Sequence, residues 1–490
     1  MNIFMEIING RIDKTLMSSR SGSKKIFKAG VGYTVGNYML KGLTFFSIPL
    51  FTRLLTTSDY GQFNTFIAYE SIVFVVIGLA LHASFKNAKY KYKHNFNRYV
   101  STCITLGLIS FSVWTIAINA IYPAISEMIG FSRTVVNLLL ISSMSNAFIQ
   151  YYNVYVGIDY EYKKFLTISF INAISGMLFS VLLICTVFHD KRYLGRIWGN
   201  VLPLLFISIY IIITFFRKSK PELNREYIKY GIKFSLPIIP HGISQVILSQ
   251  FDRIMIRSMI GMSEAGLYSF SYNIYTIIQV TATSLDNVWG TWFFEAASKK
   301  RYEEIKRNSS DYMIGMMLFS ASILLVSPEI IKLVSPSSYW NSIYCVIPIV
   351  IGGYFSFLYL LPVQVEYYFE KTKFIALGTC AAAVLNILLN AIFIPRFGYI
   401  AAAYTTLMTY FLYFLFHYLL SIYFSKRKYF NEKTILICIL VILVTGVVTF
   451  EMLQRTFVRW SIALTFCLII FVYYNWRFAF VEKIKQYFSN

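Results

Sequence analysis

The feature that most constrains this sequence is a long series of apolar runs, many of them about 20 residues in length. A helix of that length crosses a hydrocarbon core of about 30 Å, and inside a bilayer every backbone N–H and C=O must be bonded within the structure. The composition agrees, because 57% of the 490 residues are hydrophobic and 14% are charged, whereas soluble domains carry roughly a quarter charged residues. The sequence therefore predicts an all-α integral membrane protein without a sizeable soluble domain.

The positions of the runs predict about fourteen transmembrane helices joined by short connections. The predicted spans are 30–54, 62–83, 99–122, 134–156, 165–187, 195–216, 231–259, 265–289, 312–333, 342–364, 373–394, 398–423, 434–453 and 458–476. We expect two six-helix lobes around a central cavity and two additional C-terminal helices. The predicted parts are a tail (1–29), an N-lobe (30–216), a linker (217–230), a C-lobe (231–423), helices 13 and 14 (434–476) and a second tail (477–490).

The net charge of +22 indicates orientation here, although in a soluble chain it would suggest a nucleic-acid partner. About three quarters of the 45 Lys and Arg residues fall in the two tails and in every second connection. Basic residues collect in cytoplasmic loops, so the pattern predicts that both termini face the cytoplasm. The six cysteines lie in apolar stretches without CxxC spacing, and the histidines lack ligand spacing, so we expect no disulfide and no metal site.

A short pattern occurs twice, about 205 residues apart, before the second and the eighth predicted span. Ser58-Asp59-Tyr60-Gly61-Gln62-Phe63 and Ser263-Glu264-Ala265-Gly266-Leu267-Tyr268 share the form S-[DE]-x-G-x-[FY]. A convergent turn signal is one explanation, with an acidic residue that caps the next helix and a glycine that eases the turn. Because both copies lie at the same outer-facing turn six helices apart, we favour two parallel lobes related by an internal repeat.

Three stretches resemble the polysaccharide-transporter branch of the multidrug/oligosaccharidyl-lipid/polysaccharide exporters, particularly the Wzx-type flippases. They are Pro49-Leu50-Phe51-Thr52-Arg53-Leu54-Leu55 with Asp59-Tyr60-Gly61; Leu236-Pro237-Ile238-Ile239-Pro240 with Asp252-Arg253, Ile260-Gly261 and Ala265-Gly266-Leu267-Tyr268-Ser269; and Leu385-Asn386-Ile387-Leu388-Leu389-Asn390 with Ile394-Pro395-Arg396-Phe397-Gly398 and Ala401-Ala402-Ala403. The last stretch departs slightly, because the family often has Gly at the position of Ala401. The likeness extends over nearly the whole chain in length, helix count and motif order.

The resemblance implies a multi-pass protein of the inner (plasma) membrane that is not an enzyme. Such a protein flips undecaprenyl-pyrophosphate-linked oligosaccharide from the cytoplasmic to the periplasmic leaflet for O-antigen, capsule or exopolysaccharide assembly. Its implied partners are the lipid-linked substrate, the bilayer, a polysaccharide polymerase and a chain-length regulator, with no nucleic acid. No cofactor is expected, although a proton or sodium gradient could drive transport.

A flippase breaks no bond, but it needs cations for the pyrophosphate of its substrate. Lys41 lies near the middle of the first span, where Asn37, Lys41 and Thr44 form one polar face. A charge at that depth is costly and is by default a functional candidate. Arg253 and Arg257, one turn apart, and Arg53 complete the candidate phosphate set. The alternatives are pairing of Lys41 with Glu70, pairing of Arg253 with Asp252, and an interfacial position for Arg257.

Polar stripes on other spans predict a lining that contacts sugar or water. The eighth span has Tyr272, Thr276, Gln279, Thr283 and Asp286 on one face, the fourth has Asn146 and Gln150, and the seventh has Gln245. Such a face lines either a water-filled cavity or a hydrogen-bonded helix interface. Asn386 and Asn390 on the eleventh span suit a helix contact as well as a ligand site.

Three intramembrane carboxylates are candidates for ion coupling: Glu70, Asp286 and the weaker Asp252. A carboxyl group in a low-dielectric site can exchange protons near neutral pH. The plainer alternative is an ion pair with Lys41 or with an arginine.

Other functions of a similar architecture make different demands on the sequence. A multidrug exporter of cations needs acids in its cavity, whereas Lys41, Arg253 and Arg257 are basic. A polysaccharide polymerase or ligase needs a substantial outer loop, and the predicted outer connections are short. A scaffold without transport activity stays open.

Overall fold

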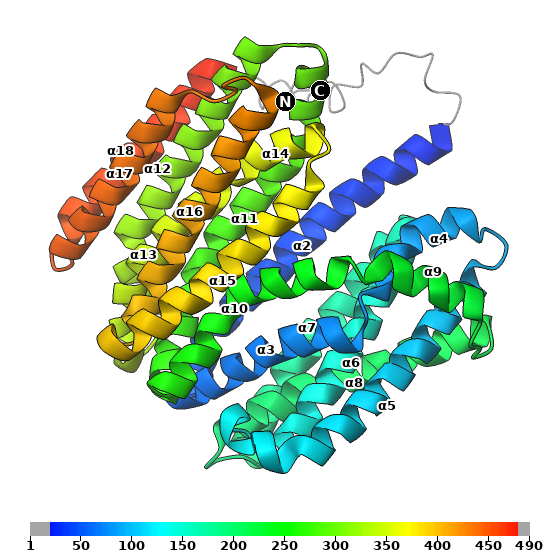
Figure 1. Cartoon of the computed structure of the whole chain (residues 1–490). Coiled ribbons are helices and arrows are strands. Elements are labelled where there is room, and N and C mark those ends of the chain that lie inside the picture. The colour runs from blue at the N-terminus through cyan, green and yellow to red at the C-terminus, as the bar shows by residue number, and fades with distance from the viewer. Residues whose placement is uncertain (1–19, 479–490) are drawn as a thin grey trace. The chain divides into compact units, whose positions relative to one another are not determined.

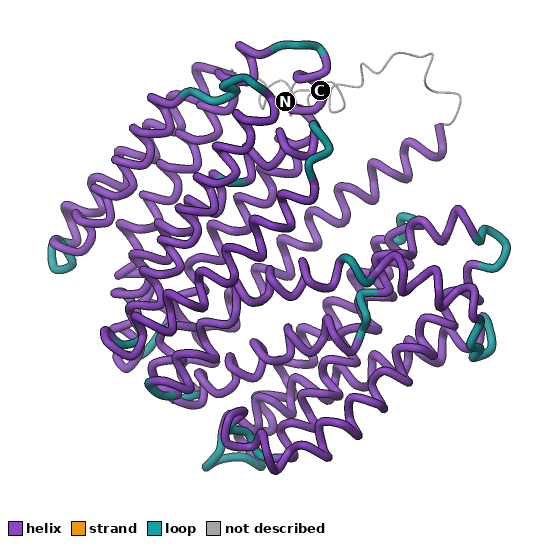
Figure 2. The backbone as a smooth tube through the Cα atoms, viewed as in Figure 1, coloured by secondary structure: helices purple, strands orange, loops and turns teal. Residues whose placement is uncertain are grey.

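The computed structural model describes residues 20–478, which form helices and short connections (Figures 1 and 2). No strand occurs in this range, which confirms the all-α class. The predicted positions of the two termini lie outside the described residues. Contacts divide the chain into two compact units, one up to Ile254 and one from Met255 onward. This division falls later than the predicted linker at 217–230, and the predicted limits of the lobes stay a prediction.

The first unit contains most of α2–α10. Its helices are α2 (Arg20–Leu54), α3 (Thr57–Ile77), α4 (Phe85–Lys91), α5 (Phe96–Ile129), α6 (Arg133–Ile158), α7 (Tyr162–Thr186), α8 (Arg192–Lys218), α9 (Arg225–Ser235) and α10 (Ile238–Met259), with a 3₁₀ turn, η2 (Leu81–Ser84). Contacts between helix ends agree with an alternating direction of successive helices. Tyr155 near the end of α6 donates to Asn97 at the start of α5 at 3.0 Å. At the opposite end, Arg192 of α8 donates to the carbonyl of Leu54 at 3.0 Å.

The second unit contains α11 (Met262–Ser298), α12 (Tyr302–Val334), α13 (Ile343–Leu358), α14 (Leu360–Tyr368), α15 (Thr372–Phe397), α16 (Ile400–Ser425), α17 (Glu432–Glu451) and α18 (Thr456–Phe478), with a 3₁₀ turn, η3 (Ser337–Ser342). Its core is α13, which packs against α11, α12, α16 and α17. Nearly every residue of α13 is buried, as its almost continuous apolar sequence predicts.

Every predicted span falls on a helix or on a pair of adjacent helices. Nine helices of the described range are long and apolar enough to cross a membrane, or ten if α3 and the segment through α4 form one bent span. The predicted number of fourteen stays a prediction. Helices α2, α6, α10 and α11 fall short of this criterion because polar and charged residues interrupt their apolar sequence. These four helices carry most of the predicted site residues.

The repeated S-[DE]-x-G-x-[FY] pattern begins a helix in each unit. Ser58 is the second residue of α3, and Ser263 is the second residue of α11. In the first copy the Asp59 amide donates to Thr56 Oγ1 at 3.1 Å, and the Asp59 carboxylate accepts from Thr56 in return. This is a capping box, which satisfies backbone donors at the start of the helix. The second copy has Gly261 at the cap and no side-chain cap bond.

A break after α3 turns the chain by 53° toward α4. Leu79 and Ala80 adopt left-handed conformations, with φ of 48° and 46°. Two side chains also donate to carbonyls of the break: Tyr151 donates to the Gly78 oxygen at 2.6 Å, and Ser235 of α9 donates to the Ala80 oxygen at 3.1 Å. The predicted span 62–83 therefore runs beyond the end of α3, and the break brings α4 close to α9.

Two other predicted spans each cover two helices. Leu236 and Pro237 separate α9 from α10 within the predicted span 231–259, because proline supplies no N–H to continue the helical hydrogen bonds. Tyr359 separates α13 from α14 within the predicted span 342–364.

The last two helices are held to the second unit by a buried arginine. Arg459 of α18 has no exposed surface and forms a two-pronged ion pair with Glu329 of α12, at 2.5 and 2.8 Å. Its remaining N–H groups donate to the carbonyls of Leu325, Met452 and Leu453. Removing one member of such a pair leaves a charge without its partner in a poorly solvated site.

We expect Arg459→Met to lower the free energy of unfolding by about 3 kcal/mol, because Glu329 would lose its partner while it stays mostly buried. Lys428→Ala is the matched control, since Lys428 pairs with Glu432 at an exposed site, and such pairs contribute below about 1 kcal/mol. Denaturant unfolding of both variants in detergent micelles measures the difference. Equal unfolding curves would show that the buried pair contributes no more than the exposed one.

Candidate transport site

The predicted phosphate ligand Lys41 is exposed on α2. Asn37 and Thr44, which share its helix face, are also exposed. Within residues 20–478 the Lys41 ammonium forms no hydrogen bond and no ion pair, so the alternative pairing with Glu70 is not formed. α2 therefore presents an uncompensated cation near the middle of its predicted span.

The predicted coupling residue Glu70 of α3 is buried, with 6% of its surface exposed. Its carboxylate accepts hydrogen bonds from Ser142 and from Asn146 Nδ2, the latter at 2.7 Å, both on α6. Ser143 also donates to the Glu70 carbonyl at 3.4 Å. Neutral groups thus hold this carboxylate, and no basic side chain of the described range pairs with it. Asn146, a predicted sugar ligand, directs its amide to Glu70.

The predicted residues of α10 are mostly buried. Asp252 and Arg253 are 1% and 6% exposed, and Arg257 is half-buried. Arg253 donates to the Ser249 carbonyl at 2.9 Å and to the Gln250 side chain at 2.5 Å. Part of its hydrogen-bonding capacity is therefore used within its own helix, and the phosphate roles of Arg253 and Arg257 stay predictions.

The remaining predicted cation, Arg53, is exposed at the end of α2. It donates to the Pro49 carbonyl one turn earlier, at 2.9 Å. Its role at the substrate phosphate also stays a prediction.

The polar stripe of α11 becomes more exposed along the helix. Tyr272 and Thr276 are half-buried, whereas Gln279 and Thr283 are exposed. Asp286, half-buried, accepts from Gln364 of α14 at 3.0 Å. Part of the stripe therefore forms a helix interface and part is exposed, and the water-filled cavity along this face stays a prediction. The other predicted polar ligands, Gln150 and Gln245, are half-buried.

A buried pair between α14 and α16 was not predicted from the sequence. His417 Nδ1 lies 2.6 Å from Glu366 Oε1, and both side chains are fully buried. Among residues 20–478, Glu366 Oε2 and His417 Nε2 have no hydrogen-bond partner. The signal was present, because an ionisable residue inside an apolar span is by default a functional candidate. No group of three or more His, Cys, Asp or Glu side chains in the described range is arranged to hold a metal ion.

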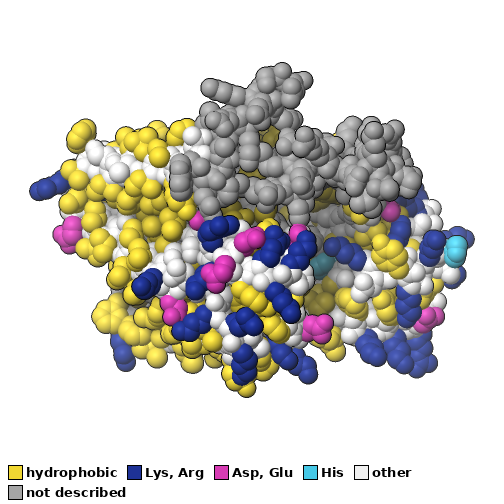
Figure 3. Space-filling model, turned by 90° about the horizontal axis from the view of Figure 1, so that it is seen from above, with side chains coloured by type: hydrophobic (Ala, Val, Ile, Leu, Met, Phe, Trp, Pro, Cys, Tyr) yellow, Lys and Arg dark blue, Asp and Glu magenta, His cyan; other side chains and the backbone are white. Residues whose placement is uncertain are grey.

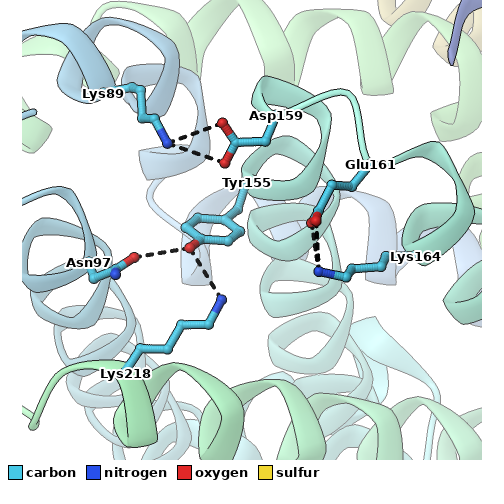
Figure 4. Close-up of polar contacts among 7 residues, drawn as sticks. All are labelled: Lys89, Asn97, Tyr155, Asp159, Glu161, Lys164 and Lys218. Atoms are coloured by element: carbon cyan, nitrogen blue, oxygen red, sulfur yellow. Dashed lines mark hydrogen bonds and ion pairs between the residues drawn. The ribbon is translucent and has the colours of Figure 1, made fainter. Parts of the chain in front are cut away.

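Basic residues gather at the end of the first unit that the charge bias assigns to the cytoplasm. Most of those in Figure 4 have a carboxylate partner: Lys89 bonds Asp159 at 3.2 Å, and Lys164 bonds Glu161 at 2.8 Å. Lys218 donates to the Tyr155 hydroxyl at 3.2 Å. Many Lys and Arg side chains, with fewer Asp and Glu, are visible on the face shown in Figure 3.

Comparison with known proteins identifies the family. Residues 27–289 match the family described as polysaccharide biosynthesis protein, which is more than half of the chain. The chain belongs to this family. It is also 23% identical over 374 residues to an Lsg locus protein of Haemophilus influenzae, a match that covers 74% of this chain and 90% of the relative.

Solved structures share the fold of this family member at low sequence identity. The lipid II flippase MurJ in an inward closed conformation matches with a TM-score of 0.70 and 16% identity, over 90% of this chain and 98% of that one. An inward-facing multidrug resistance MATE transporter of the MOP superfamily matches with a TM-score of 0.61 and 14% identity, over 79% of this chain and 94% of that one. The resemblance to the polysaccharide-transporter branch is confirmed, and the fold is the one that flippases and exporters share.

Asn386 and Asn390, which suit either a helix contact or a ligand site by sequence, form a helix contact. Asn386 and Asn390 of α15 are fully buried. Asn390 donates to Asn386 at 3.2 Å and accepts from Thr405 of α16, and Asn386 donates to Thr406 at 3.4 Å. The first turn of α16 contains three small residues, Ala401, Ala402 and Ala403. These asparagines bind α15 to α16 and leave little capacity for a ligand.

Proposed function

We propose that this protein flips a lipid-linked oligosaccharide between the leaflets of the inner membrane by alternating access, for O-antigen, capsule or exopolysaccharide assembly. The substrate is a glycan on a polyprenyl pyrophosphate, with undecaprenol as the expected lipid. The lipid tail stays in the bilayer, while the charged and polar head passes through the protein.

The observation that carries this proposal is that Lys41 is exposed and has no counter-ion in the described part of the chain. An ammonium group near the middle of a membrane-length helix costs several kcal/mol unless water or an anion meets it. Lys41 is exposed and has no counter-ion within residues 20–478. A pyrophosphate head group would supply both the charge and the hydrogen-bond acceptors that this side chain lacks. Family membership and the fold shared with a lipid II flippase support the same substrate class.

Transport against a gradient needs an energy source, and the buried carboxylates are the proposed coupling groups. Glu70 is the first candidate because its partners are neutral, so that a proton or a sodium ion can neutralise it. Asp286 and Asp252 are further candidates. No cofactor is needed for this cycle. The proposed partners are the bilayer, the glycan polymerase and its chain-length regulator.

A multidrug exporter is the second candidate function, because the same fold occurs in MATE transporters. The exposed charge on α2 is basic, which favours an anionic head group over a cationic drug. A polymerase or ligase is disfavoured because the connections between the described helices are short.

Deletion of the gene tests these functions against one another. We expect lipid-linked repeat units to accumulate on the cytoplasmic leaflet and the surface polysaccharide to disappear. Mass spectrometry of extracted lipids, together with the accessibility of the glycan to an added glycosidase in inverted and in right-side-out vesicles, measures both. Single units that accumulate on the outer leaflet would instead identify a polymerase.

A further inference from the structure

A cavity of about 490 Å³ opens between the end of α4 and helix α9, within the first unit. The residues that line it are Lys91, Tyr92, Glu226, Lys229, Tyr230, Lys233 and Phe234. The end of α4 lies near α9 (Figure 1), where the Lys91 ammonium is 4.2 Å from the Tyr230 ring centre. The volume falls within the range of about 300–1,000 Å³ that is typical of sites for small molecules.

The aromatic wall of the cavity is fixed by packing. Tyr92 stacks on Tyr99 at 5.5 Å and contacts the rings of Tyr227 and Tyr230 at 4.8 and 5.4 Å. The Tyr92 hydroxyl donates to Glu226 at 3.0 Å. Burial and the adjacent Glu226 carboxylate raise the pKa of Tyr92 to about 12, so this phenol stays neutral and keeps its donor role. Tyr99 and Tyr227 are buried and hold the wall in place.

Among the described residues, the lysines of the cavity lack the carboxylate partners that three other basic residues at this end of the unit have. Lys89, Arg98 and Lys164 each pair with a carboxylate. Lys229 and Lys233, in contrast, form no hydrogen bond or ion pair with any other described residue. Lys91 contacts the Tyr230 and Tyr92 rings at 4.2 and 5.0 Å. Three ammonium groups thus face one carboxylate, which already accepts from Tyr92.

We infer that this cavity binds the phosphorylated sugar of a lipid-linked glycan before transport. The lysines supply point charges for phosphate oxygens, and the tyrosine and phenylalanine rings supply flat faces for the apolar side of a sugar ring. The free oxygen of Glu226 accepts from sugar hydroxyls. The inference rests on the proposed transport function, and the charge bias places the cavity on the side where such a substrate is made.

The cavity and the cation on α2 would then act in sequence. The cavity residues lie in segments that the charge bias places at the cytoplasmic surface, and Lys41 lies near the middle of its predicted span. A head group held first by Lys229 and Lys233 meets Lys41 only after it enters the protein. Variants of the cavity are therefore expected to weaken initial binding, whereas removal of the Lys41 charge is expected to slow the transport step itself.

Binding to the full-length protein in phosphatidylcholine nanodiscs tests the inference. The probes are farnesyl pyrophosphoryl-N-acetylglucosamine and farnesyl pyrophosphate. We expect the double variant Lys229→Ala/Lys233→Ala to bind both probes about tenfold more weakly or worse, because two charge-assisted contacts are lost. Tyr230→Leu should weaken only the probe that carries the sugar. The matched control is Lys164→Ala/Lys428→Ala, which removes two charges that have carboxylate partners.

Three results would overturn the inference. The cavity double variant and the control could bind the probes equally, which would assign binding to another site. Phosphatidylglycerol added to the nanodisc bilayer could displace the glycan probe as strongly as unlabelled glycan does, which would show that the cavity holds bulk anionic lipid. If the unaltered protein bound neither probe, the proposed function would fail together with the cavity. If the unaltered protein bound the probes tightly and the cavity variants bound them equally well, only the inference about the cavity would be wrong, and the proposed function would stand.

Discussion

Lys41→Ala is expected to reduce flipping of the lipid-linked glycan by about tenfold to a hundredfold, which corresponds to the loss of one charge-assisted contact to phosphate. The side chain is exposed on α2 and has no partner within residues 20–478, so its removal breaks no interaction that stabilises the described fold. Alanine also favours helix formation and lowers the cost of membrane insertion. The loss should therefore appear in transport and not in the amount of inserted protein.

Two variants make this result specific to the charge on α2. Lys41→Arg keeps the positive charge and should retain a large part of the activity, although its planar donor group presents a different geometry to phosphate. Lys428→Ala removes an exposed cation that pairs with Glu432 and should export glycan normally. Surface polysaccharide and membrane-inserted protein are measured in the same deletion strain. Normal export by Lys41→Ala would remove the support for a phosphate contact on α2.

The sequence predicts the helices of this protein well because each physical signal is local. An apolar run of about 20 residues determines a helix without any knowledge of its neighbours. The polar face around Lys41 is likewise visible from helical spacing alone, and Asn37 and Thr44 are exposed with it. Proline is a weaker marker: the predicted span 231–259 runs through Pro237, which lies between α9 and α10, whereas Pro203 and Pro348 lie inside helices. The break at Leu79 and Ala80 has no such marker, because neither residue type favours a left-handed conformation.

Pairs between helices could not be predicted, because they depend on how each helix is rotated about its axis. Glu70 could have met Lys41 on charge alone, yet it meets Ser142 and Asn146 of α6. The pair of Glu366 with His417 joins residues 51 positions apart on two helices. The cavity at Lys91 requires the turn after α3 together with the position of α9, which Ser235 fixes by its bond to Ala80. Each of these features is a tertiary contact between two segments, and the local sequence of a segment does not determine which of its residues face the other.

Glu70→Gln is expected to abolish the response of transport to an ion gradient while glycan binding persists. The glutamine side chain has the same size and can still accept from Ser142 and Asn146, but it cannot take up a proton or a sodium ion. A buried carboxylate with only neutral partners is costly in its charged form, so its neutralisation can be linked to a conformational change. One coupled proton and a gradient of one pH unit correspond to about 1.4 kcal/mol, or an accumulation of about tenfold.

Proteoliposomes with an imposed proton or sodium gradient measure this effect through the accumulation of a fluorescent lipid-linked glycan. The unaltered protein should accumulate the probe in response to one of the two gradients, and Glu70→Gln should give the same low level with and without that gradient. Ser142→Ala is the matched control, because it removes one hydrogen bond to the carboxylate and leaves the ionisable group in place. Retained accumulation by Glu70→Gln would assign Glu70 a purely structural role. Asp286, which accepts from Gln364 in the second unit, would then be the next coupling candidate.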